Sequence, residues 1–504
     1  MKKIVASLCF SAAALTAAFA QSNPSASLPL SLQDCFNLVL TNNYDVRIQQ
    51  FNPQISELNV QQAYGGYDPA FTFSGSHNYN DQGAQVQSSG NVIAETITRE
   101  NTFSSGLNGL TPWGMTYNFS GNVSQFHDSR SSVITNFLSL QNIDSSSGSY
   151  GVNVTQPLLK NFWIDNNRLQ ILVAKTQLKI SEQGLRNQVI NTVTAVENAY
   201  YELIYARENV KVQQEALALA QTQLDQDKQR VQVGSLAPLD VQQDEAQVAQ
   251  SHANLIAAQY TLASDENTLK NLLTDTYTAW HDMAIEPSES LEAVRQPLDV
   301  QDSWSKGMNN RPDLQQSKLN LQQQGIQIKY FQNQLFPEVD LIGSYGFNGS
   351  GNEYNDSFSQ MGQGSRPFYS YGGQLSIPLG NVKARSQLKA GKATEKQLLL
   401  QLKQLEQNIM VQIDNAVKQA QSAWESVDAT RQTRVYAEAA LDAEQKKYAV
   451  GKSTTFTVLQ LQNNLTSARS QEIRALANYN QALANLAAAE GSTLQRRNLE
   501  IMAK

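Results

Sequence analysis

The stretch VGSLAPLDV, residues 233–241, separates two long segments that have the composition of helices. The segment before it, about 164–232, contains no proline and a single glycine, Gly184. The segment after it, to about 276, repeats an apolar residue every seven positions, at Val241, Val248, Leu255, Leu262 and Leu269. A tight turn between long antiparallel helices needs a residue such as Gly234 that tolerates a left-handed backbone. The stretch therefore predicts the tip of a long helical hairpin, about 164–276.

The predicted helices are too long for a compact globular fold. At about 1.5 Å per residue, the helix before the turn would be on the order of 100 Å long. Helices of this length are stable when they pack along their length, usually as coiled coils. Periodicity alone leaves a filamentous or scaffolding coiled coil open as an alternative.

The same arrangement occurs a second time. A shift of 217 positions maps Val233-Gly234 onto Val450-Gly451, and the second hairpin is expected over about 381–492. A shift of 268 positions maps Asn42-Asn43-Tyr44-Asp45 onto Asn310-Arg311-Pro312-Asp313. The difference between the shifts places about 51 extra residues in the first copy, between Ser76 and Arg168. The chain is therefore predicted to be an internal repeat.

Shorter elements precede each predicted hairpin in the same order. A short helix, a second helix and a β region come before each long helix, and the β regions are expected at about 68–156 and 336–378. The predicted domains are a signal peptide at 1–20, a first repeat at 21–276, a connector at 277–298, a second repeat at 299–492 and a tail at 493–504.

The first twenty residues have the pattern of a secretory signal. Lys2 and Lys3 precede an apolar run over 4–15, and Ala18-Phe19-Ala20 fits the small-x-small cleavage rule. Export would leave Cys35 as the lone cysteine of the mature chain, because Cys9 lies inside the signal. We expect Cys35 to be a buried thiol on a helix.

Four short segments alternate between apolar and polar residues, as barrel strands do. They are 70–74, 150–155, 338–341 and 369–377. The alternative interpretation is that these segments are half-buried strands of a soluble β-sandwich. Four strands cannot close a barrel, because the smallest bacterial barrels have about eight. Three chains would supply about twelve strands, so the predicted fold class is an α+β membrane protein with a trimeric 12-stranded β-barrel. That this barrel is continuous with an α-helical coiled-coil barrel is what the family resemblance described below implies.

Part of the first β region is harder to place. Residues 103–110 and 115–123 have the pattern of an additional hairpin, about 101–125, and the sequence does not say whether it joins the barrel wall. The stretches 81–100, 127–149 and 349–367 are rich in Ser, Gly or Asn and are expected to be surface loops.

Composition argues against several functions. A net charge of −7 argues against a nucleic-acid partner. The four histidines are His77, His127, His252 and His281, and their spacing would not make a metal site. No nucleotide-binding or nucleophile motif occurs, so neither an enzyme nor a cofactor is expected. A porin would need more strands and little helix. The alternative that stays open is a periplasmic coiled-coil scaffold or adaptor without a membrane barrel.

Taken together, these features resemble the TolC family of outer-membrane efflux proteins over about 31–492. The resemblance is carried by the two-copy layout and by the Asn-x-x-Asp entry to each copy, at Asn42 and Asn310. The other matching motifs are Gln156-Pro157-Leu158, Ile377-Pro378-Leu379 and the two tips, 233–241 and 448–454.

The resemblance implies a passive, gated exit duct in the outer membrane of a Gram-negative bacterium, extending into the periplasm. Its implied partners are two further copies of the chain, a periplasmic adaptor protein, an inner-membrane pump and outer-membrane lipid. It would serve multidrug efflux or type I secretion. The cargo, the particular adaptor and pump, and the resting state of the aperture stay open.

The resemblance also assigns candidate residues at the tips. The expected adaptor contacts are Gly234, Ser235, Leu236, Gly451, Lys452, Ser453 and Thr454. The family closes its aperture through polar links between hairpins, and the matching residues include Asp240 and Tyr448. Ser453 takes the place of the family's arginine, while the family's acidic ring falls on the neutral Thr457 and Gln460. Constriction by Phe456 and modest sensitivity to multivalent cations are therefore expected.

Four prolines are expected where the barrel meets the helices. Proline lacks the N–H that a strand ladder or a helix interior needs, so it favours a change of element. The candidates for this junction are Pro69, Pro157, Pro337 and Pro378.

Overall fold

A computed structural model describes residues 27–86, 92–93, 95–134 and 137–499. The predicted signal peptide at 1–20 lies outside the described residues. The chain forms two compact units, and both contain parts of each predicted repeat. Of the described residues, one unit holds those of 27–47, 191–299 and 415–488, and the other holds those of 48–190, 300–414 and 489–499.

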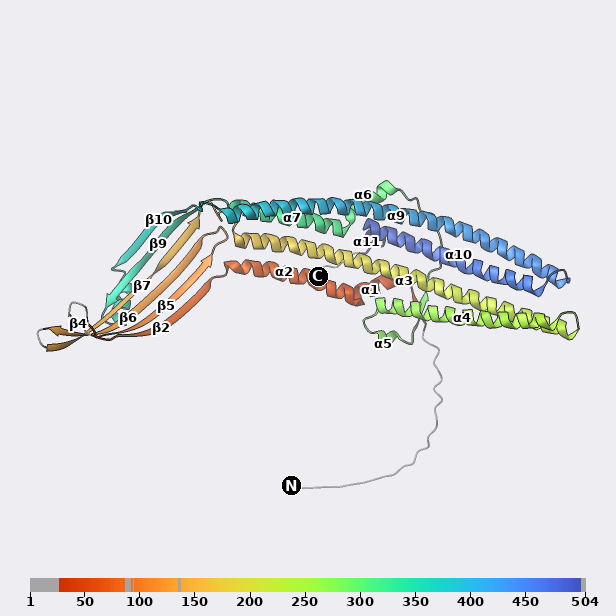
Figure 1. The fold of residues 1–504 in the computed structure, drawn as a ribbon, viewed down its shortest axis with the longest axis horizontal. Helices are drawn as coiled ribbons and strands as arrows, with labels where there is room; N and C mark the ends of the chain where they lie inside the picture. The colour runs from red at the N-terminus through yellow and green to blue at the C-terminus, as the bar shows by residue number, and fades with distance from the viewer. Residues whose placement is uncertain (1–26, 87–91, 94, 135–136, 500–504) are drawn as a thin grey trace, which may run out of the picture. The chain divides into compact units, whose positions relative to one another are not determined.

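A six-stranded antiparallel sheet dominates the second unit (Figure 1). Its order is β10-β9-β7-β6-β5-β2, so β2 and β10 are the edges. The strands are β2 (Ala70–Gln82), β5 (Thr96–Leu110), β6 (Thr116–Ile134), β7 (Phe137–Pro157), β9 (Glu338–Gly351) and β10 (Pro367–Ser376). The short strands β3 (Gln85–Val86) and β4 (Val92–Ile93) pair with each other.

The sheet differs from the expectation of four strands in a chain. Strands β5 and β6 are the additional hairpin, and they pair between β2 and β7. The sequence left their place open, and the register puts them in the same sheet as the other four. The stretches 81–100 and 127–149, expected to be loops, are largely strand in their described parts, because the strands continue past the segments with clear alternation.

The two faces of the sheet have different chemistry. Residues directly opposite one another across all six strands form rows, because the register continues from β2 to β10. One row is apolar: Phe71, Leu107, Phe119, Val152, Tyr345 and Tyr369. The adjacent row, on the other face, is mostly polar: Ala70, Asn108, Asn118, Asn153, Ser344 and Ser370. Successive strand residues point to opposite faces, so the sheet has an aromatic face and a polar face.

A short helix lies on the aromatic face, where the sequence led us to expect a loop at 349–367. This helix is α8 (Tyr354–Gln363), and a capping box between Glu353 and Asp356 begins it. The Ser357 hydroxyl donates to Ser146 on β7 at 2.8 Å, and Met361 is buried. Helix α8 therefore covers the middle of β7 on the aromatic face, around Ser146 and Gly148.

The unit with the six-stranded sheet also contains α3 (Asn166–Gln232) up to residue 190 and α9 (Val382–Ala449) up to residue 414. Its other helices are α2 (Tyr44–Tyr64), α6 (Val300–Asn310), α7 (Pro312–Asn333) and α11 (Thr493–Arg496), with a turn of 3-10 helix at Gly65–Tyr67. Helix α7 packs on α9, where Gln324 Nε2 donates to the Gly391 carbonyl at 3.0 Å. A Cβ at Gly391 would lie 3.0 Å from the Phe331 ring, so this glycine permits the close approach.

The first unit has its core where two short strands meet the long helices. Strands β1 (Ser27–Leu30) and β8 (Ala284–Pro287) pair in parallel beside α1 (Leu32–Asn42). Tyr200 on α3 is fully buried, and its hydroxyl donates to the Leu30 carbonyl at 3.0 Å. Cys35 on α1 is buried, as predicted. The short helix α5 (Tyr277–Trp280) lies in the connector.

The long helices form two hairpins. Helix α3 turns into α4 (Pro238–Leu273), and α9 turns into α10 (Thr455–Glu490) (Figure 1). Apolar contacts join α9 and α10 through Val427, Tyr479 and Leu483. Glu472, which interrupts the apolar pattern of α10, pairs with Arg434 of α9. No helix among the described residues is both long enough and apolar enough to cross a membrane.

Candidate functional site

The two hairpin tips have the same backbone geometry. Gly234 and Gly451 have φ angles of 78° and 75°, in the left-handed region that glycine favours. At each tip the glycine N–H donates three residues back, and the next N–H donates five residues back. These second bonds join Ser235 to Arg230 and Lys452 to Lys447, both at 2.9 Å. Both long helices therefore end in a Schellman motif, which satisfies their last carbonyls.

A buried polar cluster joins the two hairpins just behind the tips. The Tyr448 hydroxyl on α9 donates to the Asp227 carboxylate on α3, at 2.8 and 2.7 Å to its two oxygens. The Thr455 hydroxyl on α10 lies 2.9 Å from that of Tyr448. Within the chain, Tyr448 therefore pairs with Asp227 rather than with Asp240, the partner expected from the resemblance.

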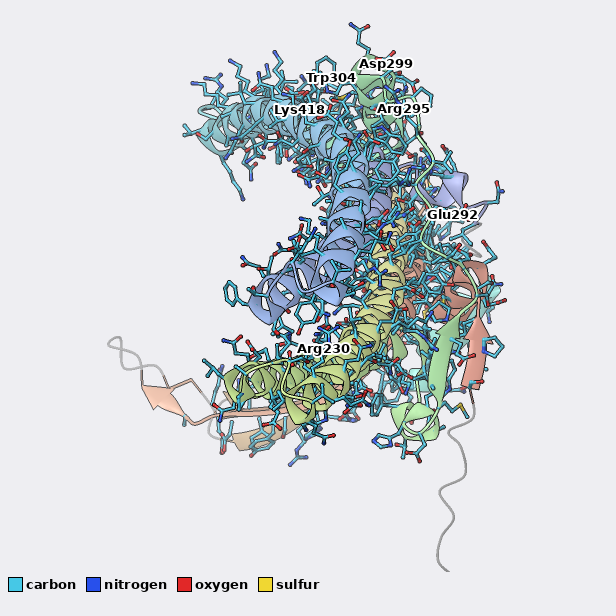
Figure 2. The ribbon with its side chains drawn as sticks, turned by 90° about the vertical axis from the view of Figure 1, so that its right-hand side faces the viewer. Arg230, Glu292, Arg295, Asp299, Trp304 and Lys418 are labelled. Carbon is cyan, nitrogen blue, oxygen red and sulfur yellow. The ribbon has the colours of Figure 1, made fainter. Side chains whose placement is uncertain are left out.

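A cation lies over the same cluster. The central carbon of the Arg230 guanidinium lies 4.4 Å from the centroid of the Tyr448 ring, and its Nη1 lies 3.9 Å from Asp227 Oδ1. Figure 2 labels Arg230 on α3, beside the turn into α4. Burial raises the pKa of Tyr448 to about 12, so its hydroxyl keeps its proton and remains a donor at neutral pH.

A second carboxyl is buried in the same place. Asp244 on α4 has no exposed surface, and neither carboxyl oxygen receives a hydrogen bond within the described chain. Burial, with a smaller contribution from the charge of Asp227, raises the pKa of Asp244 to about 7. Sequence reasoning missed both acids. Asp244 lies three residues after Val241, a position that the seven-residue repeat places in the seam.

The other predicted tip residues lie at or near the surface. Ser453 donates to Glu444 at 2.6 Å, and the hydroxyls of Thr454 and Thr457 lie 2.9 Å apart. Phe456 is 63% exposed. Gln460, Ser235 and Lys452 are exposed, while Leu236 and Asp240 are half-buried.

Exposed apolar side chains flank both turns at matching positions. Val233 and Val450 are 79% and 68% exposed, and each directly precedes a tip glycine. Leu239 and Phe456, which the shift of 217 positions also relates, are 63% exposed each. Exposed apolar groups gathered at one place on a polar surface are typical of a protein contact.

The four predicted junction prolines all lie at strand ends. Pro69 directly precedes β2 and Pro337 directly precedes β9, while Pro157 ends β7 and Pro378 follows β10. A strand therefore begins or ends at or beside each proline.

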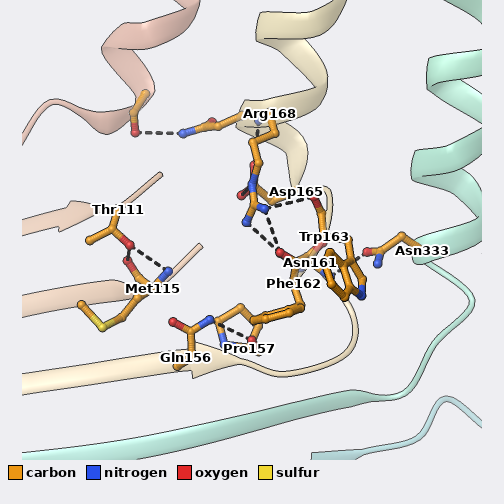
Figure 3. A network of polar contacts seen from close by, with 12 residues as sticks. Thr111, Met115, Gln156, Pro157, Asn161, Phe162, Trp163, Asp165, Arg168 and Asn333 are labelled. Atoms are coloured by element: carbon orange, nitrogen blue, oxygen red, sulfur yellow. Dashed lines mark hydrogen bonds and ion pairs between the residues drawn. The ribbon is translucent and has the colours of Figure 1, made fainter. Parts of the chain in front are cut away.

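Beside Pro157, an arginine network holds the passage from β7 into α3 (Figure 3). Arg168 Nε donates to Asp165 at 2.8 Å. Its terminal nitrogens donate to the carbonyls of Phe162, Trp163 and Asn161 at 2.7, 3.0 and 3.3 Å. One planar guanidinium thus satisfies three loop carbonyls and a carboxylate. No local sequence pattern points to Arg168 for this role.

The fold, with a two-faced sheet and paired long hairpins, defines the class of outer-membrane channels. The described chain matches the family "Outer membrane efflux protein" over residues 114–274 and 305–492. BepC of Brucella suis, an outer membrane efflux protein, is 23% identical over 66% of this chain and 69% of its own. The outer membrane protein TolC of Escherichia coli is 26% identical over 71% and 72%.

Solved structures agree with this fold. The outer membrane protein VceC of Vibrio cholerae superposes with a TM-score of 0.65 at 16% identity, covering 91% of this chain and 96% of that one. The chain belongs to the outer membrane efflux protein family. It is an outer-membrane exit duct of a Gram-negative bacterium, and its family is one of transport channels rather than enzymes. The match favours the exit duct over the periplasmic scaffold or adaptor.

Proposed function

We propose that three copies of this chain form one continuous duct, with a barrel of eighteen strands instead of the twelve that a four-strand count predicts. The six-stranded sheet of each chain supports this number. The diameter of a barrel grows roughly in proportion to its strand number, and barrels of 16–18 strands enclose an aqueous channel. The extra hairpin would therefore widen the duct in the membrane.

The open edges of the sheet support oligomerisation. Edge strands β2 and β10 present unpaired backbone groups, and nearly all of their residues are exposed. A bilayer core offers no water to such groups, so an open sheet cannot span it. Pairing of β2 in one protomer with β10 in the next would remove every edge.

The two faces of the sheet set its orientation. We assign the aromatic face to lipid and the polar face to the lumen, as in barrels that hold a wet channel. Helix α8 then lies on the outside of the wall. Its exposed residues are mostly polar, such as Asn355, Ser359 and Gln363, so we place it at the extracellular border of the membrane.

The hairpins would form the periplasmic part of the duct. In this proposal the two sequence repeats, 21–276 and 299–492, each supply one hairpin, and the connector at 277–298 lies between them. The tip residues from Gly234 to Leu236 and from Gly451 to Thr454 are the proposed adaptor contacts. The exposed Val233 and Val450 support a protein partner there. An inner-membrane pump would supply the energy, as in a tripartite efflux pump or a type I secretion system.

The proposed aperture is gated by weak polar contacts and side-chain bulk. Its residues are Asp240, Tyr448, Ser453, Phe456, Thr457 and Gln460. Because Thr457 and Gln460 carry no charge, we expect millimolar multivalent cations on the periplasmic side to leave most of the conductance intact. Single-channel recordings with a trivalent cation test this, and strong block from that side would contradict it.

Single-particle imaging of the protein solubilised from outer membranes tests the duct. Three-fold particles with eighteen strands in the wall are expected. A trimer with twelve strands would mean that β5 and β6 leave the wall on assembly. Monomers, or rods without a barrel, would overturn the proposal.

A further inference from the structure

Asp244 occupies a seam position that its counterpart fills with an apolar residue. Along α4 the buried positions Asp244, Ser251 and Ala258 are seven residues apart, which is the spacing of a coiled-coil core. The residue 217 positions after Asp244 is Leu461, in the matching turn of α10. Leucine is common at a buried core position of a coiled coil, so packing alone does not explain the carboxyl of Asp244.

The neighbouring carboxylate, Asp227, already has donors. It accepts from the Tyr448 hydroxyl and from Gln223 Nε2 at 2.8 Å, with Arg230 at 3.9 Å. Asp244 is equally buried, and neither of its oxygens receives a hydrogen bond within the described chain. A buried carboxylate without a donor is costly, and a second carboxylate beside it raises that cost.

We propose that Asp244 binds a proton and donates it to Asp227, so that one shared proton ties together the four helices behind the tips. Asp244 lies on α4, Asp227 on α3, Tyr448 on α9 and Thr455 on α10. Two ionised carboxylates have no hydrogen between them, whereas a protonated one can donate to the other. The proton comes from solvent and returns to solvent when the helices separate.

The charges around the pair determine how it titrates. Burial is the largest cause that raises the pKa of Asp244 to about 7, followed by the Asp227 carboxylate and then by the Asp240 carboxylate. Arg230 on α3 places a cation 3.9 Å from the Asp227 carboxylate. Tyr448 on α9 keeps its proton, since its own pKa is about 12, and Thr455 on α10 is neutral.

The sign of the pH dependence follows from linkage. With the helices apart, Asp244 would return to its ordinary pKa of 3.8. The packed arrangement therefore holds one extra proton between pH 3.8 and about 7. Over that interval, each unit of acidification favours it about tenfold, and the advantage is lost as the pH rises through 7. If the tips form the aperture, as proposed above, acid stabilises the packed arrangement of the four helices and neutral pH destabilises it.

Distances between the tips test the proposal. Spin labels would be placed at Ser235→Cys and Lys452→Cys, both exposed, in a Cys35→Ala background, with one labelled protomer in each trimer. From pH 7.5 to pH 5.5 we expect the ratio of packed to separated tips to rise about 25-fold. An unchanged ratio in the unsubstituted protein would overturn the proposal.

Two substitutions and one control separate this pair from other titrating groups. Asp244→Asn supplies a permanent donor, and Asp244→Leu copies Leu461. Both should hold the tips packed and make the ratio independent of pH. Asp225→Asn, at an exposed carboxyl on α3, should keep the response of the unsubstituted protein. A response that persists in both Asp244 variants would assign it to another group.

Conductance of the same preparations in planar bilayers separates this proposal from the duct itself. If the protein conducts but its tip distances do not change with pH, the shared proton is contradicted and the duct is supported. If the protein never inserts into the bilayer, the duct is contradicted. The distances between the labelled tips still decide whether Asp244 and Asp227 share a proton.

Discussion

At the scale of single residues, the Tyr448 hydroxyl is the contact most directly open to test. Tyr448→Phe keeps the ring under Arg230 but removes the donor to the buried Asp227. Hydrogen bonds to charged groups contribute about 1.5–3 kcal/mol, so we expect the packed tip to lose about that much. Hydrogen exchange of the tip amides should rise accordingly. Tyr436→Phe, at a 71% exposed tyrosine on the same helix, is the control, and equal exchange in both variants would contradict the role of Tyr448.

Arg168 makes a second prediction at this scale. Its guanidinium reaches one carboxylate and three carbonyls in the passage into α3, a set that needs a planar group with several donors. Arg168→Lys keeps the charge but cannot make all of these bonds, so we expect a loss of about 2–3 kcal/mol. Thermal unfolding of the solubilised protein measures it. Arg186→Lys, farther along α3, should have little effect, and a similar loss in both would count against the network.

At the scale of elements, the two tip turns depend on glycine. Gly234→Ala and Gly451→Ala each place a side chain at a positive φ, at a cost of about 1 kcal/mol per turn. We expect frayed helix ends and weaker adaptor capture without loss of the trimer. Circular dichroism and an adaptor pull-down would follow the two effects. Gly325→Ala in α7, where a Cβ meets nothing within 4 Å, should be neutral or stabilising.

The elements show what the sequence could predict and why the rest escaped it. Long helices such as α3 and α9 follow from runs without proline, and their tips follow from one glycine each. The first part of β7 and the last part of β6 were missed because Ser and other polar residues occur on both faces there, which weakens the period-two signal. Helix α8 was missed because its Ser and Gly content is typical of loops, and its capping box alone is a weak signal.

The candidate site shows a similar boundary. The turn residues and the strand-end prolines follow from local chemistry, so a pattern within a few residues was enough to single them out. The pair of Tyr448 and Asp227 spans 221 residues and depends on the packing of α3 against α9. No local pattern carries that information. Asp244 is the intermediate case, since its seam position was readable from the heptad although its neighbour was not.

At the scale of the whole molecule, the orientation of the barrel wall can be tested with two adjacent residues of β6. Phe119 and Asn118 are both exposed in the single chain and belong to neighbouring rows on opposite faces. If the aromatic face meets lipid, Phe119→Arg buries a charge in the bilayer at a cost of about 2–4 kcal/mol, and assembly in the outer membrane should fall sharply. Asn118→Arg instead adds a positive charge to the lumen, so the trimer should assemble and its conductance should shift toward anions. Membrane fractionation and reversal potentials in planar bilayers measure the two outcomes. The reverse result, with Phe119→Arg assembling and Asn118→Arg failing, would mean that the polar face meets lipid and that α8 lies within the duct.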